Sequence, residues 1–458
     1  MAYTNFIAAI DLGTSHMVGM VGTKDATGAL SIIAYEVENT STGIRRGYVY
    51  NVKDAAANIK RLILKLENKL DGAKISKVYV GIGGQSIRSL DHVVSRVLGA
   101  EGVVTEEIID GLYAECKAFR PDMLAVLDVV APSYTVDGKP ESNPVGVLCN
   151  RIEARYKLIV GRPALRLNVV NSVEQVAKVD IAGIQIAPLA LGEVLLSESD
   201  KDLGCALVNF GAGVTSVTIY KGGKLASLSV VPLGSNLITK DITTLRVVES
   251  EAERLKVTYG SAKTDREHDM EIPLSASDGK VRKLSLFDLN TVIEARMDEI
   301  LQNVYARLES SGLLPDLGAG IVIAGGGAAL KGLPAIMSER LKMEVRYATV
   351  RKGLVTGGDT LIASNPEFAT AIGLLAQGSL NCAYYMPPKP EPKPEPKPEP
   401  VVESVQPKVE PEVKKPQVKE KQKGKSVWKK IGEKLGSFTE GVQQELFIDD
   451  DLEQSKQK

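Results

Sequence analysis

Two stretches far apart in the chain share one construction, and this repeat constrains the fold more than any other feature. The first, IAAIDLGTS, occupies residues 7–15, and the second, LVNFGAGVTS, occupies residues 207–216. In each, an apolar run of strand-forming residues ends in a polar residue and a glycine, and hydroxyl residues follow. Two copies of a strand and a glycine turn predict a duplicated fold whose halves face each other across a cleft.

Short β-rich runs alternate with helical runs around both copies, which is typical of α/β architecture. Strands are predicted at residues 6–10, 17–21, 31–35 and 77–81 in the first half, and at 205–210, 216–220 and 225–231 in the second. Residues 54–70 place apolar side chains three and four positions apart, so an amphipathic helix is predicted there. The apolar N-terminus has no basic start, which favours a first strand over a signal peptide.

The first glycine turn carries residues suited to a polyphosphate. Gly13 lets the backbone turn tightly, so that amides and the hydroxyls of Thr14 and Ser15 can face a phosphate. Asp11 ends the preceding strand, where a carboxylate can hold the water molecules around Mg²⁺. One such turn decides little by itself, because many β-turns have the same composition.

The second turn repeats this construction with Asn209, Gly211, Gly213 and Thr215. Two hairpins can hold one polyphosphate from opposite sides, so the pair indicates a phosphate-bearing ligand more strongly than either turn alone.

A third glycine segment, IVIAGGGAAL, lies at residues 321–330. A buried strand is predicted to run into Gly325, Gly326 and Gly327 and then into a helix, where the backbone can approach a ligand closely. Taken alone, the same residues fit a tight strand–helix turn with no ligand equally well.

Composition excludes several classes of function. Lys and Arg number 56 against 57 Asp and Glu, and this balance argues against a broad nucleic-acid surface. The four cysteines and three histidines are scattered, so no zinc site or disulfide framework is expected. No uncharged apolar run reaches about 18 residues, so no transmembrane helix is predicted.

Composition changes abruptly after Met386. Residues 387–425 hold half of the chain's 22 prolines and no aromatic residue, and successive Lys-Pro-Glu-Pro units begin at Lys389. A segment of this kind cannot bury a core, so a disordered, extended linker is predicted.

Beyond the linker, residues 426–447 are predicted to form an amphipathic helix that binds a membrane surface. Its apolar stripe, with members three or four positions apart, consists of Trp428, Ile431, Leu435, Phe438, Val442 and Leu446. The lysines beside the first half of the stripe include Lys429, Lys430 and Lys434, which suit anionic lipid. Three glycines weaken the helix in water, so it is expected to order on binding. The alternative is a helix that docks into a protein groove.

The order of five motifs resembles that of the actin superfamily. They are DLGTS, the second glycine hairpin, AERLKVTYG (252–260), IVIAGGGAALKGL (321–333) and ATAIGLLAQG (369–378). Within the superfamily, residues 6–386 and the terminal helix are most similar to the FtsA family of bacterial cell-division proteins. The resemblance implies an actin-like two-lobe fold with a nucleotide cleft and an extra small α+β subdomain at 84–163. Pilus-assembly adaptors share a comparable insertion.

The resemblance also implies a division of the chain into parts. The parts are a first lobe at 1–83, completed by 164–190 and 365–386, the inserted subdomain at 84–163, a second lobe at 191–240 and 306–364 with an upper subdomain at 241–305, the linker at 387–425, and the helix at 426–447.

ATP with Mg²⁺ is the ligand that the resemblance implies. The nucleotide contacts it implies are Asp11, Gly13, Thr14, Ser15, Asn209, Gly211, Gly213, Thr215, Glu253, Lys256, Gly325, Gly326 and Gly327. Glu253 and Lys256 match positions near the ribose and base, although an exposed i,i+3 charge pair on a helix explains them as well.

The helix predicted at residues 290–301 is similar to the element that receives the C-terminal tail of the division protein FtsZ. Arg296 and Glu299 would be its polar contacts, while a solvated helix face is the plainer explanation of the two charges.

Two residues depart from the pattern of hydrolytic relatives. Asn209 stands where many ATPases of the superfamily have aspartate, and Ala187 precedes Pro188 where they often have glutamate. Glu193, one turn further, is a poor substitute on spacing. Both changes remove negative charge that would orient an attacking water molecule, so hydrolysis is expected to be weak or absent.

The resemblance implies an ATP-binding scaffold on the cytoplasmic membrane face at the division site. It would self-associate into filaments, attach FtsZ filaments to the membrane and recruit later division proteins. Two alternatives stay open: an active ATPase or small-molecule kinase of the same fold, and a pilus-type adaptor.

Overall fold

The computed structural model describes residues 4–40, 42–99, 102–274, 282–356 and 365–384. The predicted linker at 387–425 and the predicted helix at 426–447, with its Trp428 stripe and its lysines, lie outside these residues. Among the helices of the described ranges, none combines the length and the apolar character needed to cross a membrane.

The first lobe is built on a six-stranded sheet in the order β11-β6-β1-β2-β3-β19. Its strands are β1 (Ile7–Leu12), β2 (His16–Lys24), β3 (Leu30–Asn39), β6 (Lys77–Ile82), β11 (Asp180–Ile186) and β19 (Val355–Thr356). β1 pairs antiparallel with β2 and parallel with β6. The first glycine turn therefore joins two strands in the middle of the sheet.

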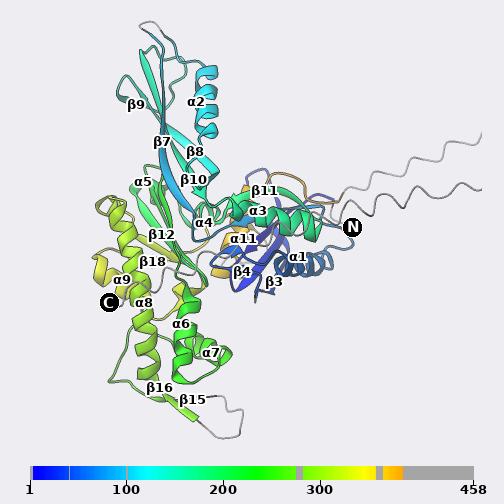
Figure 1. Cartoon of the computed structure of the whole chain (residues 1–458), viewed down its shortest axis with the longest axis vertical. Coiled ribbons are helices and arrows are strands. Elements are labelled where there is room, and N and C mark those ends of the chain that lie inside the picture. Colours follow the sequence, from blue (N-terminus) through cyan, green and yellow to red (C-terminus); the bar gives the residue numbers. More distant parts are fainter. Residues whose placement is uncertain (1–3, 41, 100–101, 275–281, 357–364, 385–458) are drawn as a thin grey trace, which may run out of the picture. The chain divides into compact units, whose positions relative to one another are not determined.

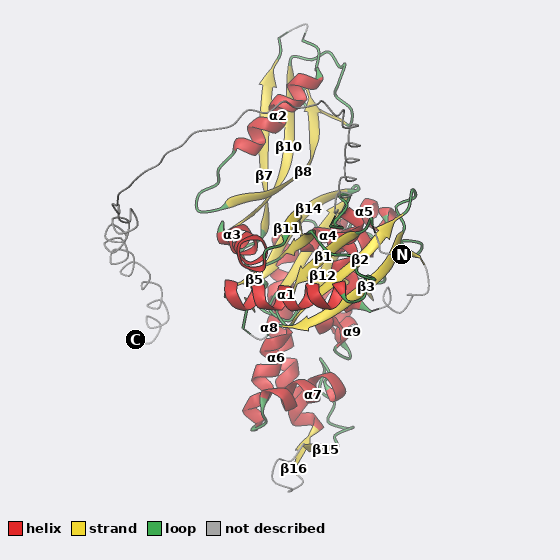
Figure 2. Ribbon diagram, turned by 90° about the vertical axis from the view of Figure 1, so that its right-hand side faces the viewer, coloured by secondary structure: helices red, strands yellow, loops and turns green. Residues whose placement is uncertain are grey.

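Helices cover both faces of this sheet. α1 (Val52–Glu67) packs on β2, where Gly19 leaves room for the side chains of Leu62 and Leu66. α11 (Ala369–Gln377) packs on the opposite face and contacts α4 (Ala187–Leu195) so closely that Gly373 has no room for a side chain. Figure 2 shows α1 lying across one face of the sheet.

The second lobe repeats the strand order of the first, β18-β17-β12-β13-β14 against β11-β6-β1-β2-β3. Its strands are β12 (Cys205–Phe210), β13 (Thr215–Lys221), β14 (Lys224–Val231), β17 (Ile321–Ala324) and β18 (Val345–Tyr347). As in the first lobe, the first strand of the set pairs antiparallel with the second and parallel with the fourth. The duplication predicted from the two glycine turns is confirmed.

One short and one long helix cover one side of the second sheet and form a separate apolar core with it. They are α6 (Ser235–Ile242) and α8 (Leu286–Ser310), and the upper subdomain adds α7 (Glu249–Tyr259), β15 (Glu271–Leu274) and β16 (Arg282–Ser285). α8 buries a stripe that includes Ile293, Met297 and Ile300.

A smaller α+β subdomain is inserted between β6 and β11, with its own core around Tyr156 and Leu158. It consists of β7 (Arg88–Val97), α2 (Glu106–Ala118), β8 (Ala125–Val136), β9 (Lys139–Glu141) and β10 (Arg151–Gly161), labelled in Figure 1. Its sheet continues that of the second lobe, because Arg88 of β7 pairs with Ser229 of β14.

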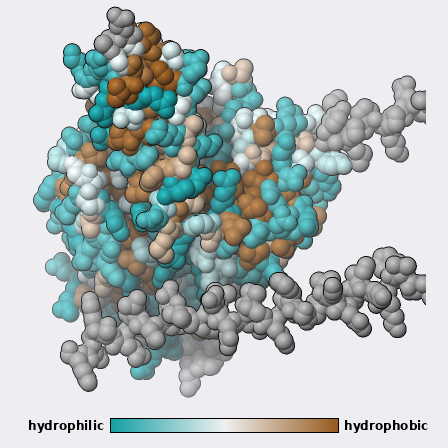
Figure 3. All heavy atoms as spheres, turned by 45° about the horizontal axis from the view of Figure 1, so that its top comes forward, coloured by the Kyte–Doolittle hydropathy of each residue, from teal (hydrophilic) through white to brown (hydrophobic). Residues whose placement is uncertain are grey.

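Apolar side chains are exposed at one end of the inserted subdomain. Val97, Val103 and Leu148 come from neighbouring segments, since Val103 bridges to Leu148 and Val97 pairs with Arg151. We call these three residues the tip patch. Figure 3 shows hydrophobic surface at the top of the view, where this subdomain lies.

Shorter elements connect these parts. They are β4 (Ile44–Arg45), β5 (Tyr48–Val49), α3 (Ala164–Val170), the π-helix η1 (Asn171–Ala177), α5 (Glu198–Leu203), α9 (Leu333–Leu341) and the 3₁₀ turns η2 (Thr243–Leu245), η3 (Leu314–Asp316), η4 (Gly326–Ala329) and η5 (Pro366–Phe368).

Two of the predicted boundaries differ from the structure. The second lobe was expected to extend to residue 364, but β19 pairs with β3 and therefore already belongs to the first sheet. The boundary at 305/306 falls inside α8, which runs unbroken to Ser310 and so joins the upper subdomain rigidly to the lobe core.

Candidate functional site

A cavity of about 520 Å³ lies between the two lobes at the glycine turns. Most of the predicted nucleotide contacts line it: Asp11, Gly13, Thr14, Ser15, Asn209, Gly211, Gly213, Glu253, Lys256, Gly325 and Gly326. These residues come from four separate stretches of the chain, and the duplicated fold brings them together around one space.

The two glycine turns touch each other at the cavity. A Cβ atom on Gly213 would lie 2.4 Å from Thr14 Oγ1, so no side chain larger than hydrogen fits there. The backbone N–H of Gly47 donates a hydrogen bond of 2.9 Å to the same Thr14 oxygen. The second turn, the first turn and the β4–β5 hairpin therefore meet at one point.

The third glycine segment approaches the cavity by way of β17. Gly325 has a φ of +85°, and a Cβ atom there would lie 2.4 Å from Asn209 Oδ1, so glycine is required for both conformation and space. A Cβ atom on Gly326 would meet nothing within 4 Å. The helix expected directly after the glycines is the short 3₁₀ turn η4, and α9 begins only at Leu333.

Two predicted contacts do not line the cavity. Thr215 is fully buried, and its hydroxyl donates a hydrogen bond of 2.9 Å to the carbonyl of Leu233. Its neighbour Ser216 lines the cavity instead, because successive residues of a strand face opposite sides. Gly327 is buried against Phe210.

Several lining residues were not predicted from the sequence. Ser235 and Asn236 begin α6, and His16 and Glu367 form a contact of 3.1 Å between Nε2 and Oε1 across the cavity wall. The Gly-Ser-Asn sequence at 234–236 is a strand-to-helix signal that could have revealed the first pair. No local sequence pattern predicts that Glu367 lines the cavity, because tertiary packing brings it there.

Glu253 and Lys256 lie on α7 and form an ion pair of 2.7 Å. Lys256 Nζ also donates a hydrogen bond of 2.8 Å to Thr239 Oγ1, and that hydroxyl lies 2.5 Å from Glu253 Oε2. The lysine side chain is largely buried, whereas the glutamate side chain is half exposed. This network holds both side chains at the edge of the cavity, where they can accept or donate hydrogen bonds.

Asp11 sits at the end of β1 with its carboxyl facing the cavity. Burial raises its pKa to about 6, opposed only in part by the backbone N–H of Leu12. A carboxylate held in so poorly hydrated a position gains from a cation brought close to it. Within the described ranges no group of three or more His, Cys, Asp or Glu is arranged to hold a metal ion.

Replacing Asp11 by asparagine is expected to stabilise the ligand-free protein at pH 7.5, by about 3 kcal/mol. The folded-state pKa of Asp11 lies above its ordinary value of 3.8, so the charged form costs free energy in the folded state. That cost is absent below about pH 4, grows as the pH rises towards 6, and is complete at pH 7.5. Urea denaturation between pH 4 and 7.5 measures the difference.

Asp25 provides the matched control for this substitution. The Thr27 hydroxyl chiefly holds the pKa of Asp25 below its ordinary value, so Asp25→Asn should lower stability at pH 7.5. An Asp11→Asn variant that is less stable than the wild type at pH 7.5 would contradict the assignment of Asp11 as a partly buried carboxyl whose charged form destabilises the fold.

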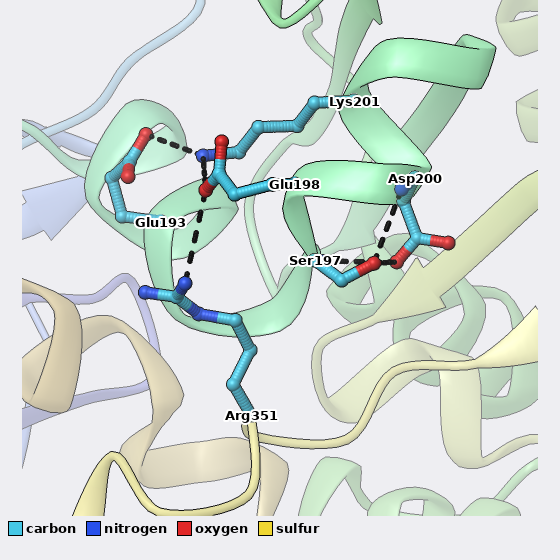
Figure 4. Close-up of polar contacts among 6 residues, drawn as sticks. All are labelled: Glu193, Ser197, Glu198, Asp200, Lys201 and Arg351. Carbon is cyan, nitrogen blue, oxygen red and sulfur yellow. Dashed lines mark hydrogen bonds and ion pairs between the residues drawn. The ribbon is translucent and has the colours of Figure 1, made fainter.

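The lining offers no obvious carboxylate beside the connecting helix. Ala187 and Pro188 line the cavity at the start of α4. Glu193 does not, because it forms an ion pair of 3.0 Å with the buried Lys201 of α5. Figure 4 shows this pair, with Glu198 between Lys201 and Arg351.

The two residues expected to contact FtsZ lie on α8, away from the cavity lining. The Arg296 guanidinium joins α8 to α6 through an ion pair of 2.5 Å with Asp241, and it also pairs with Glu299. Arg296 is therefore occupied by contacts within the protein, whereas the Glu299 side chain is half exposed.

Comparisons with known proteins agree with this architecture. The family model described as cell division protein FtsA matches residues 206–373, and the model of the SHS2 domain inserted in FtsA matches residues 84–160. The PilM–PilN type IV pilus biogenesis complex is structurally similar, with a TM-score of 0.57 and 18% identity over 81% of this chain and 97% of that one. That similarity confirms the predicted actin-like fold and carries no further conclusion.

Two curated relatives share the whole body of the chain. FtsA of Porphyromonas gingivalis is 39% identical over 83% of this chain and 79% of its own length. FtsA of Neisseria meningitidis is 32% identical over 81% of this chain and 89% of its own length. The chain belongs to the FtsA family of cell division proteins.

Proposed function

We propose that the cavity between the lobes binds ATP with Mg²⁺. The observation that carries this proposal is the meeting of two glycine turns and the Gly325–Gly326 segment around one space of about 520 Å³. Backbone amides of such turns form concave sites for phosphate oxygens. Equilibrium dialysis with labelled ATP tests the proposal, and one saturable site per chain is the expected result.

The residues present fit a magnesium ion that is held mainly by phosphate and water. Mg²⁺ in nucleotide sites is bound through one or two carboxylates and the substrate phosphates, without an all-protein cage. Asp11 supplies such a carboxylate, and Asn209, whose side-chain oxygen lies beside Gly325, lines the same cavity. A bound cation neutralises phosphate charge and removes the cost of the charged Asp11.

The other end of the cavity suits the nucleoside. Glu253 and Lys256 stand at its edge on α7, and Val257 adds an apolar contact to the lining. The carboxylate can accept hydrogen bonds from ribose hydroxyls, which gives the ion pair a binding role beyond helix stability.

Hydrolysis of the bound nucleotide is weak. Asn209 carries no charge, Ala187 replaces a carboxylate, and Glu193 is held by Lys201. A water molecule beside the phosphates therefore lacks a carboxylate at the two positions where hydrolytic relatives often carry one, and Glu367 of the described lining is engaged by His16. ATP acts chiefly as a structural ligand that contacts both lobes and so fixes their relative orientation.

The chain acts as a scaffold that joins FtsZ filaments to the cytoplasmic face of the membrane at the division site. Its family membership supports a role in division, and the apolar stripe of residues 428–446 supports peripheral attachment to lipid. The body self-associates into filaments and meets later division proteins. The exposed tip patch is a surface suited to such contacts.

The FtsZ-binding surface is tested with Glu299→Lys. Reversing this half-exposed charge should weaken binding of a labelled FtsZ tail peptide by about 1 kcal/mol, roughly fivefold, because an exposed ion pair contributes little more. Fluorescence anisotropy measures the affinity. Arg296 is the poorer test, since its loss also breaks the contact with Asp241 between α6 and α8.

Glu309→Lys is the control, because it makes the same change of charge at an exposed position near the end of α8. It should leave peptide binding unchanged. If Glu299→Lys also binds the peptide like the wild type, the interface lies elsewhere on the body.

A further inference from the structure

The cavity proposed for ATP is poor in available positive charge. Among the described residues, its lining contains the acidic residues Asp11, Glu253 and Glu367, and the basic residues Lys256 and His16. Lys256 is paired with Glu253 at 2.7 Å, and His16 contacts Glu367 at 3.1 Å. A triphosphate that enters this space needs a further cation besides a metal ion, because the basic groups of the lining already have acidic partners.

Arg46 lies beside the point where the glycine turns meet, although its side chain does not line the cavity in the ligand-free structure. A Cβ atom on Gly213 would lie 2.9 Å from the Cα atom of Arg46, so the two backbones are in direct contact. The next residue, Gly47, lines the cavity and donates a hydrogen bond to Thr14 Oγ1. The base of the Arg46 side chain is therefore fixed beside both phosphate turns.

The guanidinium of Arg46 is free to take an anionic partner. In the described part of the chain no ion pair includes Arg46, which is exposed, and its one side-chain hydrogen bond is a long contact of 3.3 Å to Gln85 Oε1. Arg45, its neighbour, differs in this respect, because its guanidinium lies over the ring of Tyr50 at 4.1 Å.

The backbone conformation of Arg46 is a second and independent indication that this residue has a special role. Arg46 and Gly47 are the two loop residues of the β4–β5 hairpin, with φ values of +46° and +74°. Two-residue loops with positive φ at both positions strongly prefer Asn-Gly, and a left-handed conformation is unfavourable for a long side chain. Arginine at position 46 is therefore an exception to the usual residue preference of this turn.

We propose that Arg46 is a phosphate-binding residue that turns from Gln85 to the polyphosphate when the nucleotide binds. Its planar group presents several N–H donors in a geometry that matches phosphate oxygens. The β4–β5 hairpin then acts as a third phosphate-binding element beside the two glycine turns. This inference rests on the proposed nucleotide site and adds a residue to it.

Arg46→Asn tests the inference, because asparagine keeps the hairpin conformation and removes only the charge and its donors. ATP–Mg²⁺ affinity, measured by equilibrium dialysis, should fall tenfold or more, while Arg46→Lys should retain most of it. Adenosine binding, followed by ligand-observed NMR, should not change, since adenosine has no phosphate. Arg45→Asn is the matched control and should bind ATP like the wild type.

The outcomes separate the inference from the proposed function. Wild-type affinity for ATP in Arg46→Asn, with the same melting temperature, would overturn the inference and leave the cleft assignment intact. An equal loss of ATP and adenosine binding would also overturn it, because the residue would then shape the site without contacting phosphate. Failure of the wild type to bind ATP would overturn both proposals.

Discussion

Gly326→Asp is expected to lower the affinity for ATP–Mg²⁺ at least 100-fold, which corresponds to about 3 kcal/mol. A side chain at this position has open space, since no atom lies within 4 Å of its Cβ position. The new carboxylate therefore stands in the cavity without displacing the backbone, and it repels the phosphates. Like charges about 4 Å apart in a partly screened site repel by about 4 kcal/mol.

Gly326→Asn is the matched control, because it has the same size and shape without the charge. It should bind ATP much more tightly than Gly326→Asp, and both variants should melt like the wild type without ligand. Equal ATP affinity for the wild type and Gly326→Asp, with both proteins folded, would remove the nucleotide from this cavity.

Trp428→Glu is expected to abolish sedimentation of the full chain with anionic liposomes. The residue lies in the predicted terminal helix, outside the described part of the chain, so the argument rests on the sequence. Full burial of one large apolar side chain is worth roughly 1.5–3 kcal/mol, and each lysine near anionic lipid adds about 1 kcal/mol. Partial burial and the cost of ordering the helix leave only a modest affinity, which one glutamate cancels.

Trp428→Leu is the control that keeps the apolar stripe, and it should still sediment with liposomes. Added salt should weaken binding of the wild type, because the lysine contribution is screened. The competing idea is a helix that docks into a protein groove. A reporter fused to residues 421–458 that ignores liposomes of every composition would favour it.

Much of the fold follows from local sequence patterns. β12 spans the residues predicted for it. The two glycine turns correctly predicted that β1–β2 and β12–β13 are copies of one unit. Apolar periodicity and glycine turns are local signals, so they identify such elements without knowledge of tertiary contacts.

The residues that line the cavity differ from the predicted set for physical reasons that local patterns do not contain. Thr215 was named because it follows the second glycine turn, but in β13 it faces the core, and the next residue, Ser216, faces the cavity. Glu367 and Gly47 reach the cavity only because distant segments pack beside the first turn. The chain returns to the first sheet at β19 because β19 pairs with β3, and the two strands are more than 300 residues apart in the sequence.

Flotation of FtsZ filaments with anionic liposomes in a density gradient tests the scaffold function most directly. With the full chain and ATP, FtsZ should rise with the liposomes. With Trp428→Glu it should stay at the bottom. With Gly326→Asp less of it should rise, because we expect self-association to require bound ATP, and weaker self-association lowers the avidity of many helices. FtsZ that stays at the bottom with the wild-type chain, or rises equally with Trp428→Glu, would contradict the account.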